Sequence, residues 1–212
     1  MTNAEDYRRT RESLHAVAEQ LLAGPEYRRS RTIRLVAAPG GFATVKEPKL
    51  AVREDLLLAD DEPVGKLHGS TIAELAAAAG LEPGMPEGVY ADVTGFDPHA
   101  QLWIDADQAR ILTRAYELGD AALRALGPGA TPVLWPEHFD IGIDLDEVNY
   151  GVSPGDALIG EPYAYIGPWT PRSGDFWNQS FGAARTIAEL GGSEALLEFF
   201  TAGRLLAARE PK

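Results

Sequence analysis

The sequence predicts an α+β fold, in which antiparallel β-sheet packs against several helices. Apolar residues recur at helical spacing in some segments, and short β-compatible runs bounded by glycine and proline lie between them. The resulting order of helix, strands, helix, helix, strands, helix lacks the regular alternation of a parallel βαβ protein. We expect a single globular domain over residues 1–212, divisible into an N-terminal helix-plus-meander half and a C-terminal strand-helix half.

The first predicted helix covers about residues 4–22. Asn3 can cap its start, and Gly24-Pro25 is a typical stop signal. The apolar residues of this segment recur at helical spacing: Leu14, Val17, Leu21 and Leu22. We therefore expect an amphipathic helix that ends before Gly24.

A small antiparallel meander is predicted next. Its β-compatible runs are residues 32–38 and 50–58, separated by a Pro-Gly-Gly turn, with residues 64–68 as a third strand. Thr71 and Glu74 then have the capping-box spacing, in which each side chain can bond the other residue's backbone N–H. A short helix is expected to begin there.

The middle of the chain is predicted as a long loop followed by the most regular helix. Residues 82–101 are rich in Pro, Gly and Asp without periodicity, which indicates a connecting loop. Asp105 can cap a helix that ends near Gly127, and residues 131–144 are strand-like. Ser193 is expected to cap a final helix.

The charge of the chain argues against nucleic acid as a partner. A formal net charge of −13 repels a phosphate backbone at long range. The one basic stretch is interleaved with acidic residues, so we expect a solvated, salt-bridged surface. Its arginines are Arg8, Arg9, Arg11, Arg28, Arg29, Arg31 and Arg34.

The chain contains no cysteine, which excludes disulfides, thiolate catalysis and Cys-ligated zinc or iron–sulfur sites. Its N-terminus is polar and acidic rather than basic and apolar, and no stretch approaches membrane-spanning length. We therefore expect a soluble cytoplasmic protein without a membrane partner.

The segment from Val133 to Asp144 carries the first group of candidate site residues. As a single strand it would place its large apolar residues on one face. The opposite face would carry His138, Asp140, Gly142 and Asp144, and residues two apart on a strand lie roughly 6.5 Å apart. His138 and Asp140 could therefore share a ligand or a metal.

A second strand-like segment, residues 158–167, follows a turn-like stretch at residues 149–156. Alternation places Glu161, Tyr163 and Tyr165 on one face. If the two segments pair, His138, Asp140 and Glu161 could converge as a catalytic group. They could hold Zn, Mn or Fe, or a histidine beside a carboxylate could act as general base without metal.

The predicted function is binding of a small polar ligand or a divalent metal at this face, which could be catalytic. Its predicted ligand contacts are Trp135, Asn149, Tyr150, Tyr163 and Trp169. The cofactor and the metal stay unknown, and so does whether the protein is an enzyme. A solvated sheet face is the simpler interpretation, and a non-catalytic interaction or homodimer surface over residues 135–177 is the alternative.

Three segments of this region resemble a family of uncharacterised actinobacterial proteins. They read LWPEHFD from Leu134, VNYGVSPGD from Val148 and EPYAYIGP from Glu161. The resemblance covers most of the chain, including segments that begin at Pro39, Tyr116 and Phe181. It implies membership of that family and brings no activity or mechanism with it.

Overall fold

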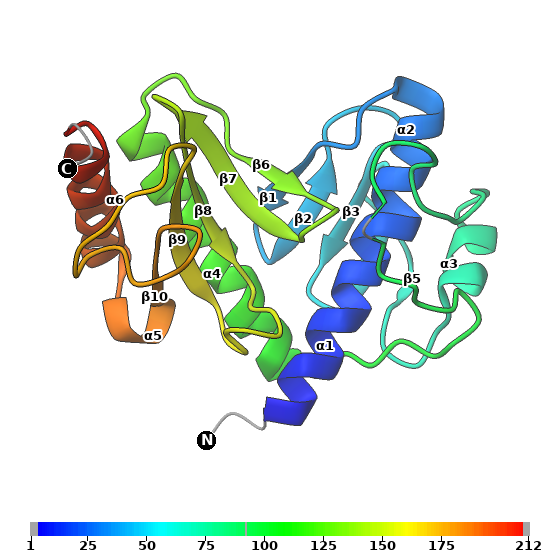
Figure 1. Ribbon diagram of the computed structural model, residues 1–212. Helices are drawn as coiled ribbons and strands as arrows, with labels where there is room; N and C mark the ends of the chain where they lie inside the picture. The colour runs from blue at the N-terminus through cyan, green and yellow to red at the C-terminus, as the bar shows by residue number, and fades with distance from the viewer. Residues whose placement is uncertain (1–3, 92, 210–212) are drawn as a thin grey trace. The chain divides into compact units, whose positions relative to one another are not determined.

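The computed structural model describes residues 4–91 and 93–209 (Figure 1). Antiparallel strands and packed helices make up the chain, which confirms the predicted α+β class. The chain divides into two compact units. Unit 1 is Met1–Arg114 with Leu134–Phe139, and unit 2 is Ala115–Val133 with Asp140–Lys212.

The first helix runs past its predicted stop. α1 (Ala4–Val17) continues through a π-helical turn, η1 (Ala18–Ala23), into α2 (Gly24–Ser30). The wider turn lets the Gly24 N–H reach the Glu19 carbonyl, and it accommodates Pro25, whose ring would clash in a regular helix. The prediction that Gly24-Pro25 ends the helix is therefore wrong, and the predicted cap Asn3 lies outside the described residues.

The sheet of unit 1 extends the predicted meander to six strands, in the order β6-β1-β2-β3-β4-β5. The strands are β1 (Leu35–Ala38), β2 (Gly41–Thr44), β3 (Leu50–Arg53), β4 (Leu56–Ala59), β5 (Glu62–Lys66) and β6 (Val133–Trp135). The predicted single strand over residues 50–58 is divided because Glu54, at φ 54°, turns the chain between β3 and β4. Leu21, Phe42 and Leu57 are buried in the core of this unit.

Two predicted caps are confirmed. Thr71 and Glu74 form both hydrogen bonds of the capping box at the start of α3 (Ile72–Ala78). Asp105 accepts hydrogen bonds from the backbone N–H groups of Asp107 and Gln108, both at 3.0 Å, at the start of α4 (Ala106–Leu126). Among the described residues of the 82–101 loop there is no helix or strand, as predicted.

The predicted single strand over residues 131–144 is wrong. β6 ends at Trp135, a turn follows, and β7 (Asp140–Leu145) begins a separate strand. The turn contains Pro136, which lacks an N–H, and Phe139 at φ 53°. The His15 ring stacks on Phe139 with centroids 5.1 Å apart, and its Nε2 lies 2.7 Å from the Pro136 carbonyl oxygen. These contacts hold the turn against α1.

Unit 2 contains a four-stranded antiparallel sheet in the order β10-β9-β8-β7. Its other elements are β8 (Val148–Ser153), β9 (Tyr163–Pro168), β10 (Ala183–Thr186), α5 (Ile187–Leu190) and α6 (Ser193–Ala207). Most of residues 149–156 therefore form a strand rather than the predicted turn. Gly192, not Ser193, is the N-cap residue of α6, and it makes no side-chain cap.

One face of this sheet packs against helices and forms the core of unit 2 (Figure 1). A Cβ atom on Gly119 of α4 would lie 2.9 Å from Cγ2 of Val152, and one on Gly203 of α6 would overlap the Ile166 side chain. Tyr150 contacts Phe200 edge to face at 6.0 Å. The small residues thus let both helices approach the strands closely.

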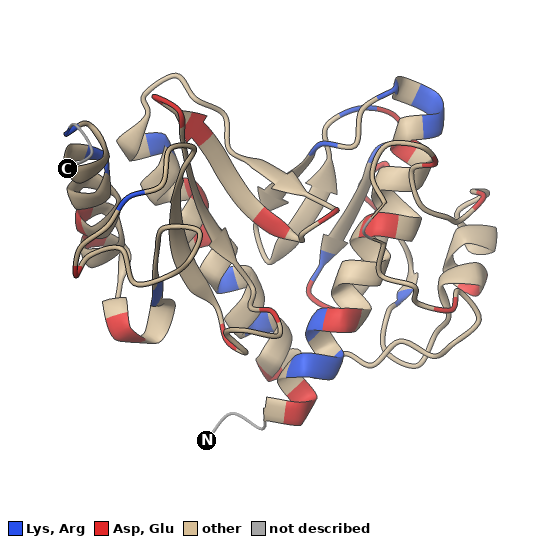
Figure 2. Cartoon of the chain, in the orientation of Figure 1, with Lys and Arg blue, Asp and Glu red and all other residues tan. Residues whose placement is uncertain are grey.

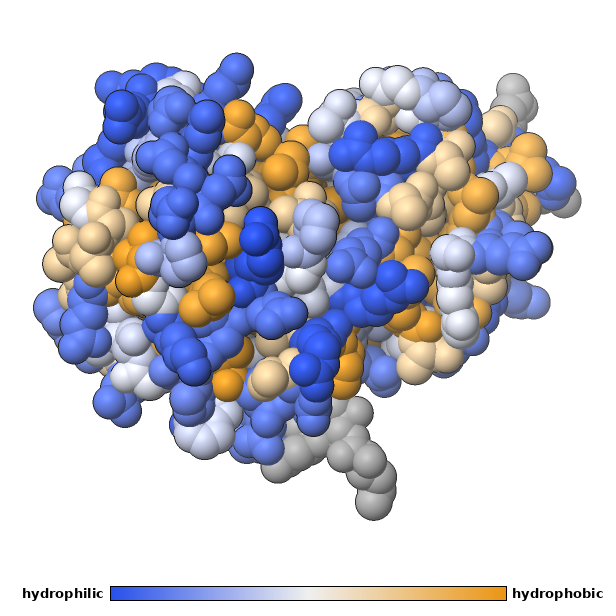
Figure 3. All heavy atoms as spheres, turned by 180° about the vertical axis from the view of Figure 1, so that it is seen from behind, coloured by the Kyte–Doolittle hydropathy of each residue, from blue (hydrophilic) through white to orange (hydrophobic). Residues whose placement is uncertain are grey.

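The exterior mixes polar and apolar side chains, as the view from behind shows (Figure 3). The most exposed large apolar residues are Leu158, Trp169 and Leu205. No helix within residues 4–91 or 93–209 has the length and apolar character to cross a membrane.

Candidate functional site

The face of the unit 2 sheet opposite its core is lined by polar residues and glycines, and we call it the polar face. Strand register aligns Gly142 with Gly151 and Gly151 with Tyr165. Because paired residues of antiparallel strands point to the same side, the remaining members follow by alternation. They are Asp140, Asp144, Asn149, Ser153, Tyr163 and Gly167.

Tyr165 of β9 reaches across β8 to Asp140 of β7. Its phenolic hydroxyl donates a hydrogen bond to Oδ2 of Asp140, a residue that is only 8% exposed. A Cβ atom on Gly151 would overlap the tyrosine ring, and one on Gly142 would lie 3.1 Å from the hydroxyl. A side chain at position 151 would therefore exclude the ring from its place over the strands, and one at position 142 would crowd its hydroxyl.

A second phenol–carboxylate pair adjoins the first. The Tyr163 hydroxyl donates to Oδ2 of Asp156 at 2.6 Å, and Oδ1 of Asp156 accepts from the backbone N–H groups of Leu158 and Ile159. The Tyr163 and Tyr165 ring centroids are 6.4 Å apart. Ser153, paired with Tyr163 in register, is buried beside them. We call Asp140, Ser153, Asp156, Tyr163 and Tyr165 the carboxylate–phenol cluster.

Burial raises the pKa of both phenols in this cluster. For Tyr165 the negative charge of Asp140 adds to the effect of burial and raises the pKa well above its ordinary value. For Tyr163 the hydrogen bond to Asp156 adds to burial in the same direction. Both hydroxyls therefore stay protonated at neutral pH and act as hydrogen-bond donors rather than as bases.

The other end of the polar face is open to solvent. Asp144 pairs with Asn149, and Asn149 pairs with Gly167, so these residues form one row across three strands. Trp169 lies beyond the end of β9, is 62% exposed, and donates from Nε1 to Oδ1 of Asn149 at 3.4 Å. Its backbone N–H is held by the Glu147 carbonyl at 3.0 Å. An aromatic ring is thereby presented to solvent beside an amide and a carboxylate.

The three predicted catalytic residues lie in different local settings. His138 is exposed in the turn before β7 and belongs to unit 1, whereas Asp140 and Glu161 belong to unit 2. Asp140 is buried in the cluster, and Glu161 is exposed in a bend before β9, outside the strand face it was predicted to share. The part of the chain that the structure describes holds no group of three His, Asp or Glu side chains able to bind a metal ion.

The five predicted ligand contacts divide in the same way. Asn149, Tyr163 and Trp169 lie on or beside the polar face. Tyr150 is fully buried on the opposite face, where burial raises the pKa of its hydroxyl to about 12. Trp135 is half-buried on β6 of unit 1, with the Arg34 guanidinium 5.7 Å from its ring centroid.

Sequence reasoning missed three members of the cluster as site residues: Ser153, Asp156 and Tyr165. Tyr165 shares a strand face with Tyr163, and this alternation was visible in the sequence. That Gly142 and Gly151 lie beneath its ring follows only from the pairing of three strands. Ser153 and Asp156 read as turn residues because Pro154 and Gly155 lie between them.

No family model, no curated protein and no solved structure matches the chain. The resemblance to an actinobacterial family therefore stays a prediction.

Proposed function

We propose that the polar face of unit 2 binds a small polar ligand. The observation that carries this proposal is the hydrogen bond between buried Asp140 and half-buried Tyr165, held across two glycines of neighbouring strands. A buried carboxylate with one buried and one half-buried phenol on the same sheet face is costly unless their hydrogen-bonding groups are used. Ligand sites commonly combine a few convergent polar groups of this kind with an aromatic wall.

The residues indicate the chemistry of the ligand. Asp140 and Asp156 offer carboxylate oxygens to hydroxyl or amino groups, and each phenolic oxygen, whose one O–H is donated to a carboxylate, can accept a further hydrogen bond from the ligand. At the open end, Trp169 offers a flat apolar surface beside the Asn149 amide. A small molecule with several hydroxyl or amino groups and one apolar face matches this arrangement.

The proposal concerns binding, and catalysis is a separate hypothesis. His138 and Glu161 are exposed, and neither side chain forms a hydrogen bond within the described parts of the chain. A catalytic role would require ligand turnover that falls in His138→Ala and Glu161→Gln variants while ligand affinity is kept.

The test is a thermal-shift screen followed by isothermal titration calorimetry. The probes are amino acids, monosaccharides, amino sugars and linear polyols. We expect at least one probe to bind, and Tyr165→Phe and Trp169→Ala each to weaken that binding about tenfold, the scale of one lost hydrogen bond or stacking contact.

The matched control is Tyr27→Phe, which removes a phenolic hydroxyl from unit 1. It should leave ligand affinity unchanged. If a probe binds the parent and all three variants equally well, or if no probe binds at all, the polar face is not the proposed site.

The alternative is an interaction or homodimer surface. Fewer of its predicted aromatic residues are exposed than the sequence led us to expect. Trp169 is exposed, but Tyr163 is buried, and Trp177 packs edge to face on Phe176 at 5.0 Å. Leu158, at 68% exposed, is a further apolar anchor in unit 2. Sedimentation velocity tests this alternative, because a dimer would dissociate in Trp169→Ala or Leu158→Ser.

A further inference from the structure

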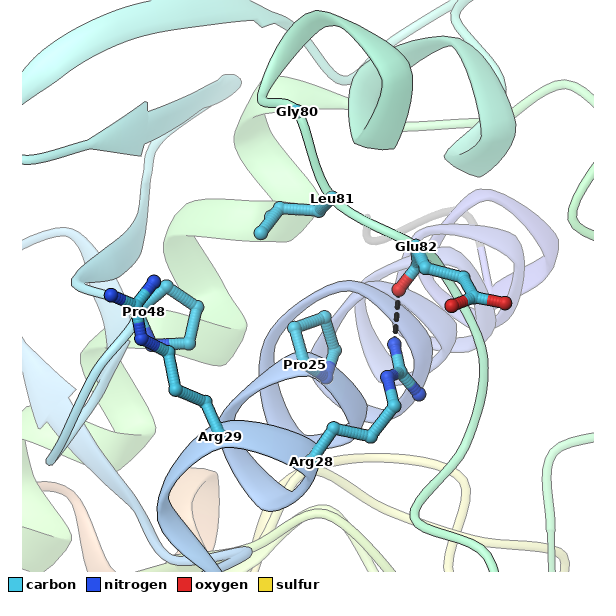
Figure 4. A pocket seen from close by; sticks show the side chains of 7 residues that line it. All are labelled: Pro25, Arg28, Arg29, Pro48, Gly80, Leu81 and Glu82. Carbon is cyan, nitrogen blue, oxygen red and sulfur yellow. Dashed lines mark hydrogen bonds between the residues drawn. The ribbon is translucent and has the colours of Figure 1, made fainter.

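Unit 1 has a cavity of about 270 Å³ beside α2 (Figure 4). Three segments contribute to it: α2, the loop between β2 and β3, and the chain that follows α3. The lining residues are Pro25, Arg28, Arg29, Pro48, Gly80, Leu81 and Glu82. Two guanidinium groups and three apolar side chains therefore border the same space.

The arginines on α2 and just after it differ from Arg8 of α1 in their ion pairs. Acidic residues interleave with them in the sequence, which predicted a salt-bridged surface, and Arg8 does pair with Glu5 and Glu12. No ion pair involves Arg28, Arg29, Arg31 or Arg34 within the described ranges, so the prediction is wrong for these four.

Arg28 and Arg31 instead contact a backbone carbonyl and an aromatic ring. Arg28 donates to the backbone carbonyl of Glu82, and Arg31 lies over the Tyr27 ring at 5.5 Å. No ion pair joins the Glu82 carboxylate to either guanidinium of the cavity. Figure 2 shows the resulting basic segment on α2. In a chain with a net charge of −13, this local excess of positive charge favours an anion.

Contacts within the protein hold the segments around the cavity in place without a ligand. Glu26, fully buried, accepts a hydrogen bond from the Lys46 backbone N–H at 2.5 Å, and Ser30 Oγ donates to the Glu47 carbonyl at 2.7 Å. Gly24 lies so close to the Gly84 carbonyl that a Cβ atom would overlap it. These contacts fix α2 against both neighbouring segments, and a fixed site loses less entropy when it binds.

We propose that this cavity binds a small organic anion, with Arg28 and Arg29 holding its carboxylate or phosphate group. A guanidinium presents several N–H donors in one plane, which match two oxygens of such a group. Pro25, Pro48 and Leu81 contact the apolar part of the ligand. The site lies in unit 1 and is independent of the polar face of unit 2.

Isothermal titration calorimetry at low ionic strength, with phenyl phosphate, benzoate and inorganic phosphate as probes, tests the proposal. We expect saturable binding of one phenyl phosphate or benzoate per chain. Which of the two binds more tightly identifies the charged group. Inorganic phosphate should bind more weakly than phenyl phosphate, because it leaves the apolar walls unused. Equal affinity for these two probes would overturn the assigned role of the apolar walls.

The variants are Arg28→Gln and Arg29→Gln, each expected to weaken binding about tenfold through loss of a charge-assisted hydrogen bond. Arg31→Gln and Arg34→Gln are matched controls, because they remove the same charge from the same region outside the cavity. They should change affinity less than about threefold.

Equal weakening by all four variants would show general electrostatic attraction and overturn the proposed site. Absence of saturable binding for all three probes would overturn it too. Circular dichroism spectra establish that each variant is folded. Arg29→Gln keeps the test valid even if loss of the Arg28–Glu82 contact perturbs α2.

Discussion

The hydroxyl of Tyr165 reaches the carboxylate of Asp140 because the strand between them and the strand that carries Asp140 both present glycine beneath the ring. β8 contributes Gly151, and β7 contributes Gly142. The pair thus depends on three strands at once. The contribution of this pair to the free energy of unfolding can be tested by displacing the ring with a substitution at a glycine and by removing the hydroxyl.

Replacing Gly151 with alanine should displace the Tyr165 ring. The added methyl group would overlap the ring, so we expect the free energy of unfolding to fall by about 1–3 kcal/mol. Urea denaturation measures the change. Gly160→Ala is the control, since a Cβ atom there meets nothing within 4 Å, and an equal loss in both variants would contradict the explanation.

Removing only the hydroxyl should also destabilise the protein. Tyr165→Phe deletes a donor to a buried carboxylate, which costs about 1–3 kcal/mol of unfolding free energy. Tyr27→Phe should cost less than about 0.5 kcal/mol, the usual range for surface substitutions. Urea denaturation compares the two, and unchanged stability of Tyr165→Phe would mean that the hydrogen bond contributes nothing.

Glu26 should make stability depend on pH. Burial raises its pKa from 4.5 to about 7, against the opposing hydrogen bonds of the Lys46 and Val45 backbone N–H groups and the Lys46 charge. The folded state therefore binds this proton more tightly than the unfolded state does. Between about pH 4.5 and 7, the contribution of Glu26 to the free energy of unfolding should fall as pH rises, by on the order of 3 kcal/mol.

Urea denaturation across this pH range tests the prediction. Glu26→Gln should remove this contribution to the pH dependence, because glutamine does not titrate. Glu62→Gln, an exposed change of the same charge on β5, should leave the dependence as in the parent. Parallel pH profiles for the parent and Glu26→Gln would refute the assignment.

Gly119 tests the close approach of α4 to the unit 2 sheet. Alanine gains about 1 kcal/mol in helix propensity over glycine. The added methyl group would lie 2.9 Å from the Val152 side chain, however, and overpacking costs about 1–3 kcal/mol. We expect Gly119→Ala to be neutral or destabilising by up to about 2 kcal/mol in thermal or urea unfolding.

A double-mutant cycle with Val152→Ala separates the two effects. If the contact with Cγ2 of Val152 is responsible, Gly119→Ala should be less destabilising in the Val152→Ala background than in the parent. Additive effects of the two substitutions would mean that they do not interact.

The candidate site was predictable in part. Alternation identified Asp140, Tyr163 and Tyr165 as residues of a polar strand face, whereas Asn149 was predicted as a ligand contact in a turn. Alternation failed for Glu161, because β9 begins two residues later. It also failed to place Trp135 relative to residues 140–144, because a turn separates β6 from β7. Alternation is informative only within an unbroken strand, and where a strand ends is decided by its neighbours.

The sequence by itself determined the features that depend on neighbours along the chain. These include the α+β class, the caps at Thr71 and Asp105, and the long helix α4, since each follows from hydrogen bonds or apolar spacing within a few residues. Tertiary structure alone decided the π-turn before Pro25, the register that places Tyr165 over Gly151, and the lack of an ion pair at Arg28 and Arg29 among the described residues. Those features depend on which distant segments pack together, because pairing energies and steric contacts act between residues that the sequence order does not bring together.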